Sequence, residues 1–230
     1  MSARQIFTRT DFRTRVRDSL GPSNFWSDDE LNVYINFALR DWNRFTGYWK
    51  RRITLTTQQY NPYLSLPTTL TMGMRVEFNG SPLAPGSVFD WDKMYPYWEG
   101  ESSTPVEWAP VGLNLIAIRP ADSRGNNSLV VDGVSATPVL AADADFVDLG
   151  QEQFGAVLDY IQHLASFKEG GREFQNTEGQ LRHFIAEAGL NCERFRASSL
   201  YRRLMGLDTD FGKKKRRQSV SQGESPVGVR

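Results

Sequence analysis

Residues 27–47 read SDDELNVYINFALRDWNRFTG, and this stretch predicts an amphipathic helix with a defined start and a defined end. Ser27 and Glu30 form a capping box, in which the two residues satisfy each other's backbone donors at the helix start. Gly47 ends the pattern. Between these signals, apolar residues recur at helical spacing and define one face, which consists of Leu31, Ile35, Ala38, Trp42 and Phe45.

On the C-terminal side of this helix, the hydrophobic period changes from helix to strand. Between Trp49 and Thr57 apolar side chains alternate with polar ones, and later stretches are rich in β-branched and aromatic residues. Asn79-Gly80 is typical of a two-residue hairpin turn, and prolines punctuate the remainder. The middle third is therefore predicted to be a small antiparallel β unit, with strands at about residues 49–57, 62–66, 73–78, 113–119 and 128–134.

Within this β unit, residues 88–95 predict a short helix. Its spacing would place Phe89, Trp91 and Met94 on the sheet, together with Trp98. Most of these aromatic side chains are expected in the core, and the remainder are left for a partner surface.

Helices are also predicted on both sides of these segments. A short, Arg-rich helix spans about residues 11–20, with Thr10 as its candidate cap. After the β region, a helix near Gln151 has one apolar face made of Phe154, Leu158, Ile161 and Ala165, widened by Val157, Leu164 and Phe167. Gly170-Gly171 interrupts it, and a last long helix is expected to continue toward Leu204 through Leu181, Phe184, Ile185, Ala188, Cys192 and Phe195. Because the connection is short, these two helices are predicted to pack antiparallel.

The order of these elements predicts an α+β fold. We expect an antiparallel helical bundle with an inserted small antiparallel β domain and an extended C-terminal arm. Residues 1–48 would supply the N-terminal helices, 49–148 the β-rich insertion, 149–206 the C-terminal helices and 207–230 the basic arm. The arm is too polar to bury the apolar surface that folding alone would require.

Composition narrows the class of protein. The chain has 230 residues, 40% of them hydrophobic, which is enough for one domain or two small ones. Its formal net charge of zero hides an asymmetry, because residues 194–230 hold 10 Lys+Arg and 3 Asp+Glu, and residues 1–193 hold 17 Lys+Arg and 24 Asp+Glu.

No apolar run has the length of a signal sequence or membrane span, so we expect an unsecreted, soluble chain. The single cysteine, Cys192, excludes an intrachain disulfide and is expected to be a small buried hydrophobe.

The histidines do not predict a catalytic or metal site. His163 and His183 each lie on a predicted helix outside any recognisable motif, so both are expected to have structural or surface roles. One cysteine and two separated histidines do not provide a zinc site at the usual spacing.

The carboxylates give no stronger signal. An acidic loop lacks the glycine and the closing glutamate of a calcium loop, and is expected to cap the helix near Gln151 or to be solvated; it contains Asp143, Asp145 and Asp148. Glu99 and Glu101 could form a glycosidase pair, but their spacing alone does not indicate one. We therefore predict no catalytic residue, cofactor or metal, and no enzyme activity.

The basic run Lys213 to Arg217 is the sharpest local feature. It fits a solvated tail, an arm that becomes ordered on an acidic protein surface, or a nucleic-acid contact. Only Phe211 lies nearby, so base stacking is not supported. The opposite charges of body and tail favour an arm that reaches a neighbouring subunit or partner. The predicted partner-contact residues are Arg202, Arg203, Phe211, Lys213, Lys214, Lys215, Arg216 and Arg217.

Over about residues 10–206, the chain resembles the head-to-tail adaptor, or head completion, proteins of short-tailed bacteriophages. The resemblance includes the β insertion and rests on Trp26–Leu31 with Tyr34–Asn36, on Phe167–Phe174 and on Asn191–Ser198, of which the last two blocks are the most specific. None of these blocks is a catalytic signature.

The resemblance implies a structural protein of the virion, located at the head-tail junction and assembled in the host cytoplasm. Such adaptors form a ring beneath the portal, commonly of twelve copies, and join it to a tail or nozzle protein. Their C-terminal arm typically docks on the portal, and DNA passes through the central channel without sequence-specific contact. Here that assignment would give the arm, with Lys213 to Arg217, a portal-binding role.

Two other classes of function are weighed against this connector. A nucleic-acid-binding module acting through the basic tail would show duplex binding that falls steeply with salt, because neutralising phosphates releases counterions. A hydrolase acting through acidic residues would lose a measurable activity when Glu99 or Glu101 is replaced. The connector is the leading hypothesis.

Overall fold

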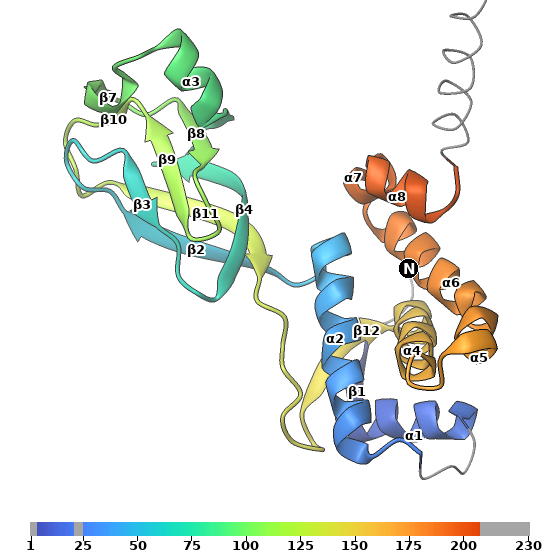
Figure 1. The fold of residues 1–230 in the computed structure, drawn as a ribbon. Coiled ribbons are helices and arrows are strands. Elements are labelled where there is room, and N and C mark those ends of the chain that lie inside the picture. The colour runs from blue at the N-terminus through green and yellow to red at the C-terminus, as the bar shows by residue number, and fades with distance from the viewer. Residues whose placement is uncertain (1–3, 21–24, 208–230) are drawn as a thin grey trace, which may run out of the picture. The chain divides into compact units, whose positions relative to one another are not determined.

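The computed structural model describes residues 4–20 and 25–207 (Figure 1). The chain divides into two compact units. The helical unit contains residues 4–20, 25–46 and 140–207, and the β unit contains residues 47–139. The predicted α+β class is confirmed. Phe211 and the run Lys213 to Arg217 lie outside the described residues.

The helical unit combines helices with a two-stranded ribbon. Its elements in chain order are β1 (Arg4–Thr8), α1 (Arg9–Leu20), α2 (Asp28–Thr46), β12 (Phe146–Gly150), α4 (Gln151–Ser166), α5 (Gly171–Asn176), α6 (Glu178–Asn191), α7 (Glu193–Arg196) and α8 (Ser199–Leu204).

Helix α2 begins as its sequence predicts. The Ser27 backbone N–H donates to Glu30 Oε2 at 2.8 Å, and the Glu30 backbone N–H donates to Ser27 Oγ at 3.2 Å, which confirms the capping box. The predicted apolar face is buried at Leu31, Ile35, Ala38 and Trp42. Phe45 is half-buried and stacks on Phe195 with ring centroids 4.8 Å apart.

Helices α4 and α6 pack antiparallel, as predicted. His163 Nδ1 lies 2.9 Å from Thr177 Oγ1 at the start of α6, and Asp159 Oδ2 lies 2.6 Å from His183 Nδ1. Further along, Gln153 contacts Asn191 at the other end of α6. Because falling residue numbers on α4 meet rising numbers on α6, the two helices run in opposite directions.

The expected single long C-terminal helix was wrong. Helix α6 ends at Asn191, and Cys192 has an extended backbone (φ −139°, ψ 100°) before α7 and α8. The cause is the close packing of Tyr201 against Gly189, where an added Cβ would lie 2.4 Å from the Tyr201 ring. The chain must turn back to make this contact, and Ser198 caps α8 by accepting a hydrogen bond from the Tyr201 backbone N–H. Cys192 is consequently only partly buried and outside the helix, contrary to expectation.

The two-stranded ribbon of the helical unit was not predicted. β1 pairs antiparallel with β12, in the register Ile6 to Asp148. Each strand has only five residues, too few for a clear period of two. The ribbon buries Phe7, whose ring stacks on that of Phe154 with centroids 3.8 Å apart.

The β unit consists of two four-stranded sheets with small additions. The order in one sheet is β2-β11-β4-β5 and in the other β3-β9-β8-β6. The predicted strands correspond to β2 (Lys50–Thr56), β3 (Tyr63–Ser65), β4 (Leu70–Phe78), β9 (Leu115–Arg119) and β11 (Ser128–Ser135). The remaining elements are β5 (Ser81–Pro82), β6 (Ala84–Pro85), α3 (Val88–Met94), the 3₁₀ helix η1 (Trp98–Gly100), β7 (Ser102–Ser103), β8 (Glu107–Pro110) and β10 (Ala121–Asp122).

The β-unit core lies between the two sheets. Side chains that alternate along three strands enter this core: Val76 and Phe78 of β4, Ile116 and Ile118 of β9, and Leu129 and Val131 of β11. Asn79 (φ 48°) and Gly80 (φ 82°) make the predicted turn between β4 and β5 with the positive φ angles that such turns require. The core cluster consists of Leu64, Leu66, Leu70, Val76, Phe78, Leu83, Trp108, Ile116, Ile118, Leu129 and Val131.

Helix α3 and η1 cover the outer face of the second sheet, as Figure 1 shows for α3 above β8 and β9. Trp91 and Trp98 are buried there against Ala109 and Ala117, which confirms the predicted short helix. Phe89 and Met94 were wrongly placed on the sheet, because Trp91 already occupies the packed face of this short helix. Their side chains are 66% and 63% exposed.

Candidate interaction surfaces

The described residues offer neither a metal cluster nor a membrane span. Within residues 4–20 and 25–207, no group of three or more His, Cys, Asp or Glu side chains is arranged to hold a metal ion. In the same part of the chain, no helix is both long enough and apolar enough to cross a bilayer.

The two histidines lie in packing contacts between helices. His163 is 8% exposed, and burial lowers the pKa of its imidazole. His183 is exposed and pairs with Asp159 on the neighbouring helix. Both side chains therefore connect α4 with the segment that begins at Thr177.

Glu99 and Glu101, the two carboxylates considered as a catalytic pair, have different surroundings in the β unit. Glu99 accepts a hydrogen bond from the Tyr63 hydroxyl, and burial together with this carboxylate raises the pKa of Tyr63 to about 12. Glu101 is exposed after η1. Both residues lie on the outer layer of the β unit, and Glu99 positions a tyrosine there.

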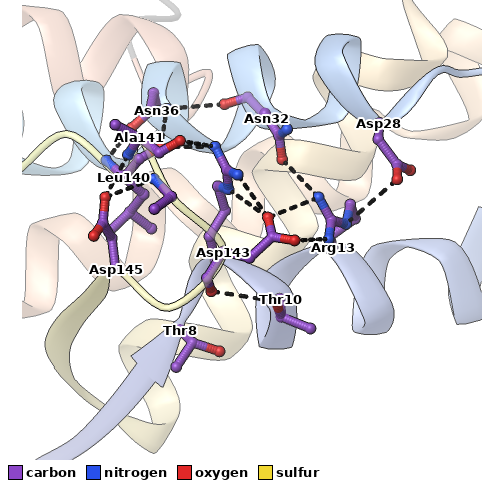
Figure 2. Close-up of polar contacts among 12 residues, drawn as sticks. Thr8, Thr10, Arg13, Asp28, Asn32, Asn36, Leu140, Ala141, Asp143 and Asp145 are labelled. Carbon is purple, nitrogen blue, oxygen red and sulfur yellow. Dashed lines mark hydrogen bonds and ion pairs between the residues drawn. The ribbon is translucent and has the colours of Figure 1, made fainter.

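Asp143 is the centre of a charge cluster in the helical unit (Figure 2). Its carboxylate accepts hydrogen bonds from Arg9 Nη2 at 2.6 Å and from Arg13 Nη2 at 2.9 Å. These bonds, first that from Arg13 and then that from Arg9, lower the pKa of Asp143 to about 2. The expectation that the acidic loop caps the following helix was wrong, because α4 has Gly150 at its N-cap position and no side-chain cap. Asp143 is nevertheless exposed, as the alternative of a solvated loop expects.

The segment around Asp143, residues 140–145, is held along its length and is called the return segment below. Asn36 of α2 accepts from the Leu140 backbone N–H at 2.9 Å and donates to the Leu140 carbonyl at 3.2 Å. Asp145 Oδ2 accepts from the backbone N–H groups of Ala141 and Ala142, each at 2.7 Å. Figure 2 shows these contacts converging on one loop, so α1 and α2 fix the point where the chain re-enters the helical unit.

Replacing Asp143 with asparagine should loosen the return segment and remove part of the acid sensitivity of the protein. Because the folded-state pKa lies below the unfolded value, the carboxylate stabilises the fold above about pH 4, and this contribution is lost as the pH falls toward about 2. The melting temperature of the parent chain should therefore fall more steeply between these pH values than that of Asp143→Asn.

Asp18→Asn, which removes an exposed carboxylate from α1, is the control. Hydrogen exchange should increase at residues 140–145 in Asp143→Asn and stay unchanged in this control. Equal acid sensitivity of parent chain and Asp143→Asn would contradict the assigned role.

The structure describes two of the predicted partner-contact residues, Arg202 and Arg203. Both are exposed in the last turn of α8, where cations are favourable against the helix dipole. Leu200 and Leu204 on the same short helix are 46% and 38% exposed. Arg202 and Arg203 therefore adjoin apolar side chains on a short element at the end of the described chain.

Helix α8 packs on α6 and α7 through Tyr201. The Tyr201 ring packs edge-on against Phe195 with centroids 5.4 Å apart, and it fills the space above Gly189. Since Tyr201 faces inward, the exposed side chains of α8 face away from α6. Hydrophobic periodicity does not predict this packing. The glycine at position 189 could have indicated it, because a residue without a side chain leaves room for a neighbouring ring.

Comparison with protein-family models matches residues 7–205 to the family described as SU10 adaptor protein. A search among curated proteins finds no match. The matched stretch runs from within β1 to the residue after α8, and it thus includes parts of both compact units.

Proposed function

The chain belongs to the SU10 adaptor protein family, which comprises phage head-to-tail adaptors, and from this membership we propose that it forms a ring beneath the portal. In this proposal, the ring joins the portal to a tail or nozzle protein and continues the DNA channel. DNA passes through without sequence-specific contact, and the ring contains twelve copies. The family is structural and implies no catalytic function.

The observation that carries the proposal is the extent of the family match. It includes the helical unit and the inserted β unit together, so the family assignment concerns the whole described architecture and not one common motif. A ring of identical subunits needs two different patches on each copy, which meet head to tail and close by rotation.

Portal binding is proposed for α8 and the residues that follow it. Support comes from the exposed Arg202 and Arg203 beside exposed leucines, and from the basic run Lys213 to Arg217 further along the sequence. The positive charge of residues 194–230 would steer this end toward an acidic partner surface, and apolar contacts would supply affinity.

Deleting residues 207–230 and reversing the two arginines, in Arg202→Glu/Arg203→Glu, should each weaken portal binding about tenfold or more. The measurement is mass photometry of each variant mixed with the cognate portal ring, at moderate and high salt. Arg172→Glu, an exposed charge reversal on α5, is the matched control and should bind normally.

Normal portal binding by both variants would contradict the proposed contact. If instead the parent chain ignores the portal but binds duplex DNA with a steep salt dependence, the function is that of a nucleic-acid-binding module.

A further inference from the structure

The β unit is built in layers, and two of its surfaces differ in charge. One outer layer is α3 with η1, which packs through Trp91 and Trp98 on the sheet of β8 and β9. The core cluster lies beneath that sheet, and the sheet of β2, β11 and β4 lies beyond it, as can be followed in Figure 1. Because stacked sheets lie about 10 Å apart, side chains of the α3 layer cannot touch the sheet of β2, β11 and β4 in the same copy.

The first outer face is acidic and partly apolar. Residues 88–101 contain four acidic side chains and one lysine, and the four are all exposed: Asp90, Asp92, Glu99 and Glu101. Large apolar side chains are exposed on the same short stretch, with Phe89 at 66%, Met94 at 63% and Tyr97 at 86%. Residues 88–101 are called the acidic cap below. An exposed apolar cluster with a charged surround is typical of a protein contact.

The second surface is a basic hollow beside the start of β2. This hollow has a volume of about 390 Å³ and is lined by Lys50, Arg51, Arg52, Met74, Asp132 and Gly133. Its shape follows from an irregularity of the sheet, because the pairing of β11 with β4 skips Met74 between Arg75 and Gly73. Gly133 contributes no side chain to fill the space.

The charge of the hollow is only partly neutralised within the chain. Arg52 makes two hydrogen bonds to Asp132, at 2.6 and 2.8 Å. Lys50 and Arg51 are exposed and have no ion-pair partner among residues 4–20 and 25–207. Lys50 and Arg51 therefore lie beside an open space of about 390 Å³ and can pair with acidic groups from outside the β unit.

We propose that the acidic cap of one copy docks on the basic hollow of the next copy. The two faces are complementary in charge, and the exposed aromatic and methionine side chains of the cap provide apolar groups for the hollow. Since the cap lies on the sheet of β8 and β9 and the hollow is lined by residues of β2, β4 and β11, each copy can use both at once. Repetition of this contact gives the head-to-tail association that a ring needs, so the inference rests on the proposed ring.

The test uses charge reversal in the full chain. The cap variant is Asp90→Lys/Glu101→Lys, and the hollow variant is Lys50→Glu/Arg51→Glu. Each should self-associate about tenfold more weakly than the parent chain at low salt, because like charges then face each other. An equimolar mixture of the two variants should associate again, since the reversed cap fits the reversed hollow. Sedimentation velocity over a concentration series measures both effects.

Arg124→Glu, an exposed reversal in the loop between β10 and β11, serves as the control and should associate like the parent chain. Equal weakening by this control, unchanged association of both variants, or failure of the mixture to recover would overturn the inference. So would a parent chain that stays monomeric at every concentration.

The same variants mixed with the portal ring separate this inference from the proposed function. If the parent chain binds the portal and both reversals leave the number of bound copies unchanged, the cap-to-hollow contact is refuted and the adaptor function stands. If the parent chain neither binds the portal nor self-associates, the proposed ring itself fails.

Discussion

Replacing Phe184 with alanine is expected to lower the free energy of unfolding of the helical unit by about 3–5 kcal/mol. The side chain is fully buried at the centre of the unit. Its ring stacks on Tyr160 of α4 with centroids 4.2 Å apart and lies 5.7 Å from the ring of Trp42 on α2. One ring thus joins three helices, and its removal leaves a cavity that rigid neighbours cannot fill.

The effect should be confined to the helical unit, because the core clusters of the β unit contain none of these residues. Hydrogen exchange under mildly denaturing conditions should show lost protection in α2, α4 and α6, with the protection of β11 unchanged. Leu190→Ala is the matched control, since Leu190 lies on the same helix but is 70% exposed. A loss below about 1 kcal/mol in Phe184→Ala would mean that α6 does not pack on α2 and α4 as described.

The sequence predicted those parts of the fold whose signals are local. Ser27 and Glu30 define the start of α2 within four residues, and Asn79-Gly80 determines a turn by its own backbone preferences. The break after Asn191 was missed because its cause is a contact between Gly189 and Tyr201, which periodicity does not report. The pairing of β1 with β12 joins segments more than one hundred residues apart, so no local window contains it.

The candidate surfaces also differ in whether local sequence or contacts between distant residues determine them. Arg202 and Arg203 were selected from a local cluster of charge, and the structure places them on one exposed helical turn. The ion pairs of Asp143 could not be predicted in this way, because its partners Arg9 and Arg13 lie at the other end of the sequence. The acidic cap and the basic hollow could not be paired in advance, since their opposition depends on the order of the layers in the β unit.

Replacing Asp122 with alanine should destabilise the β unit by about 2–4 kcal/mol, since hydrogen bonds to a buried charged group are each worth about 1.5–3 kcal/mol and some will be replaced. Asp122 is 2% exposed. Its carboxylate accepts from Thr57 Oγ1 at the end of β2, from Asn127 Nδ2 at 2.8 Å and from the Arg124 backbone N–H at 3.0 Å. It therefore joins β2 to the loop that leads into β11.

The pH dependence of this variant distinguishes the loss of a carboxylate from a general loss of packing. Burial raises the pKa of Asp122, but the hydrogen bonds from Thr57, Asn127 and the loop backbone outweigh it, and the net shift is downward. The stabilisation is therefore present above the unfolded pKa of about 3.9 and is lost as the pH falls through the folded value. Asp122→Ala should lack this part of the acid sensitivity.

The expected loss is measured by urea denaturation at neutral pH, with hydrogen exchange of β2 and β11 identifying the unit affected. Asp90→Ala removes an exposed carboxylate from α3 and should leave the stability within about 0.5 kcal/mol of the parent chain. Asp122→Asn retains one acceptor and should fall between the parent chain and Asp122→Ala. If Asp122→Ala were as stable as Asp90→Ala, water would have to replace the carboxylate for Thr57, whose side chain is also buried. The loop would then not depend on Asp122, and the joint between β2 and β11 would rest on their backbone ladder alone.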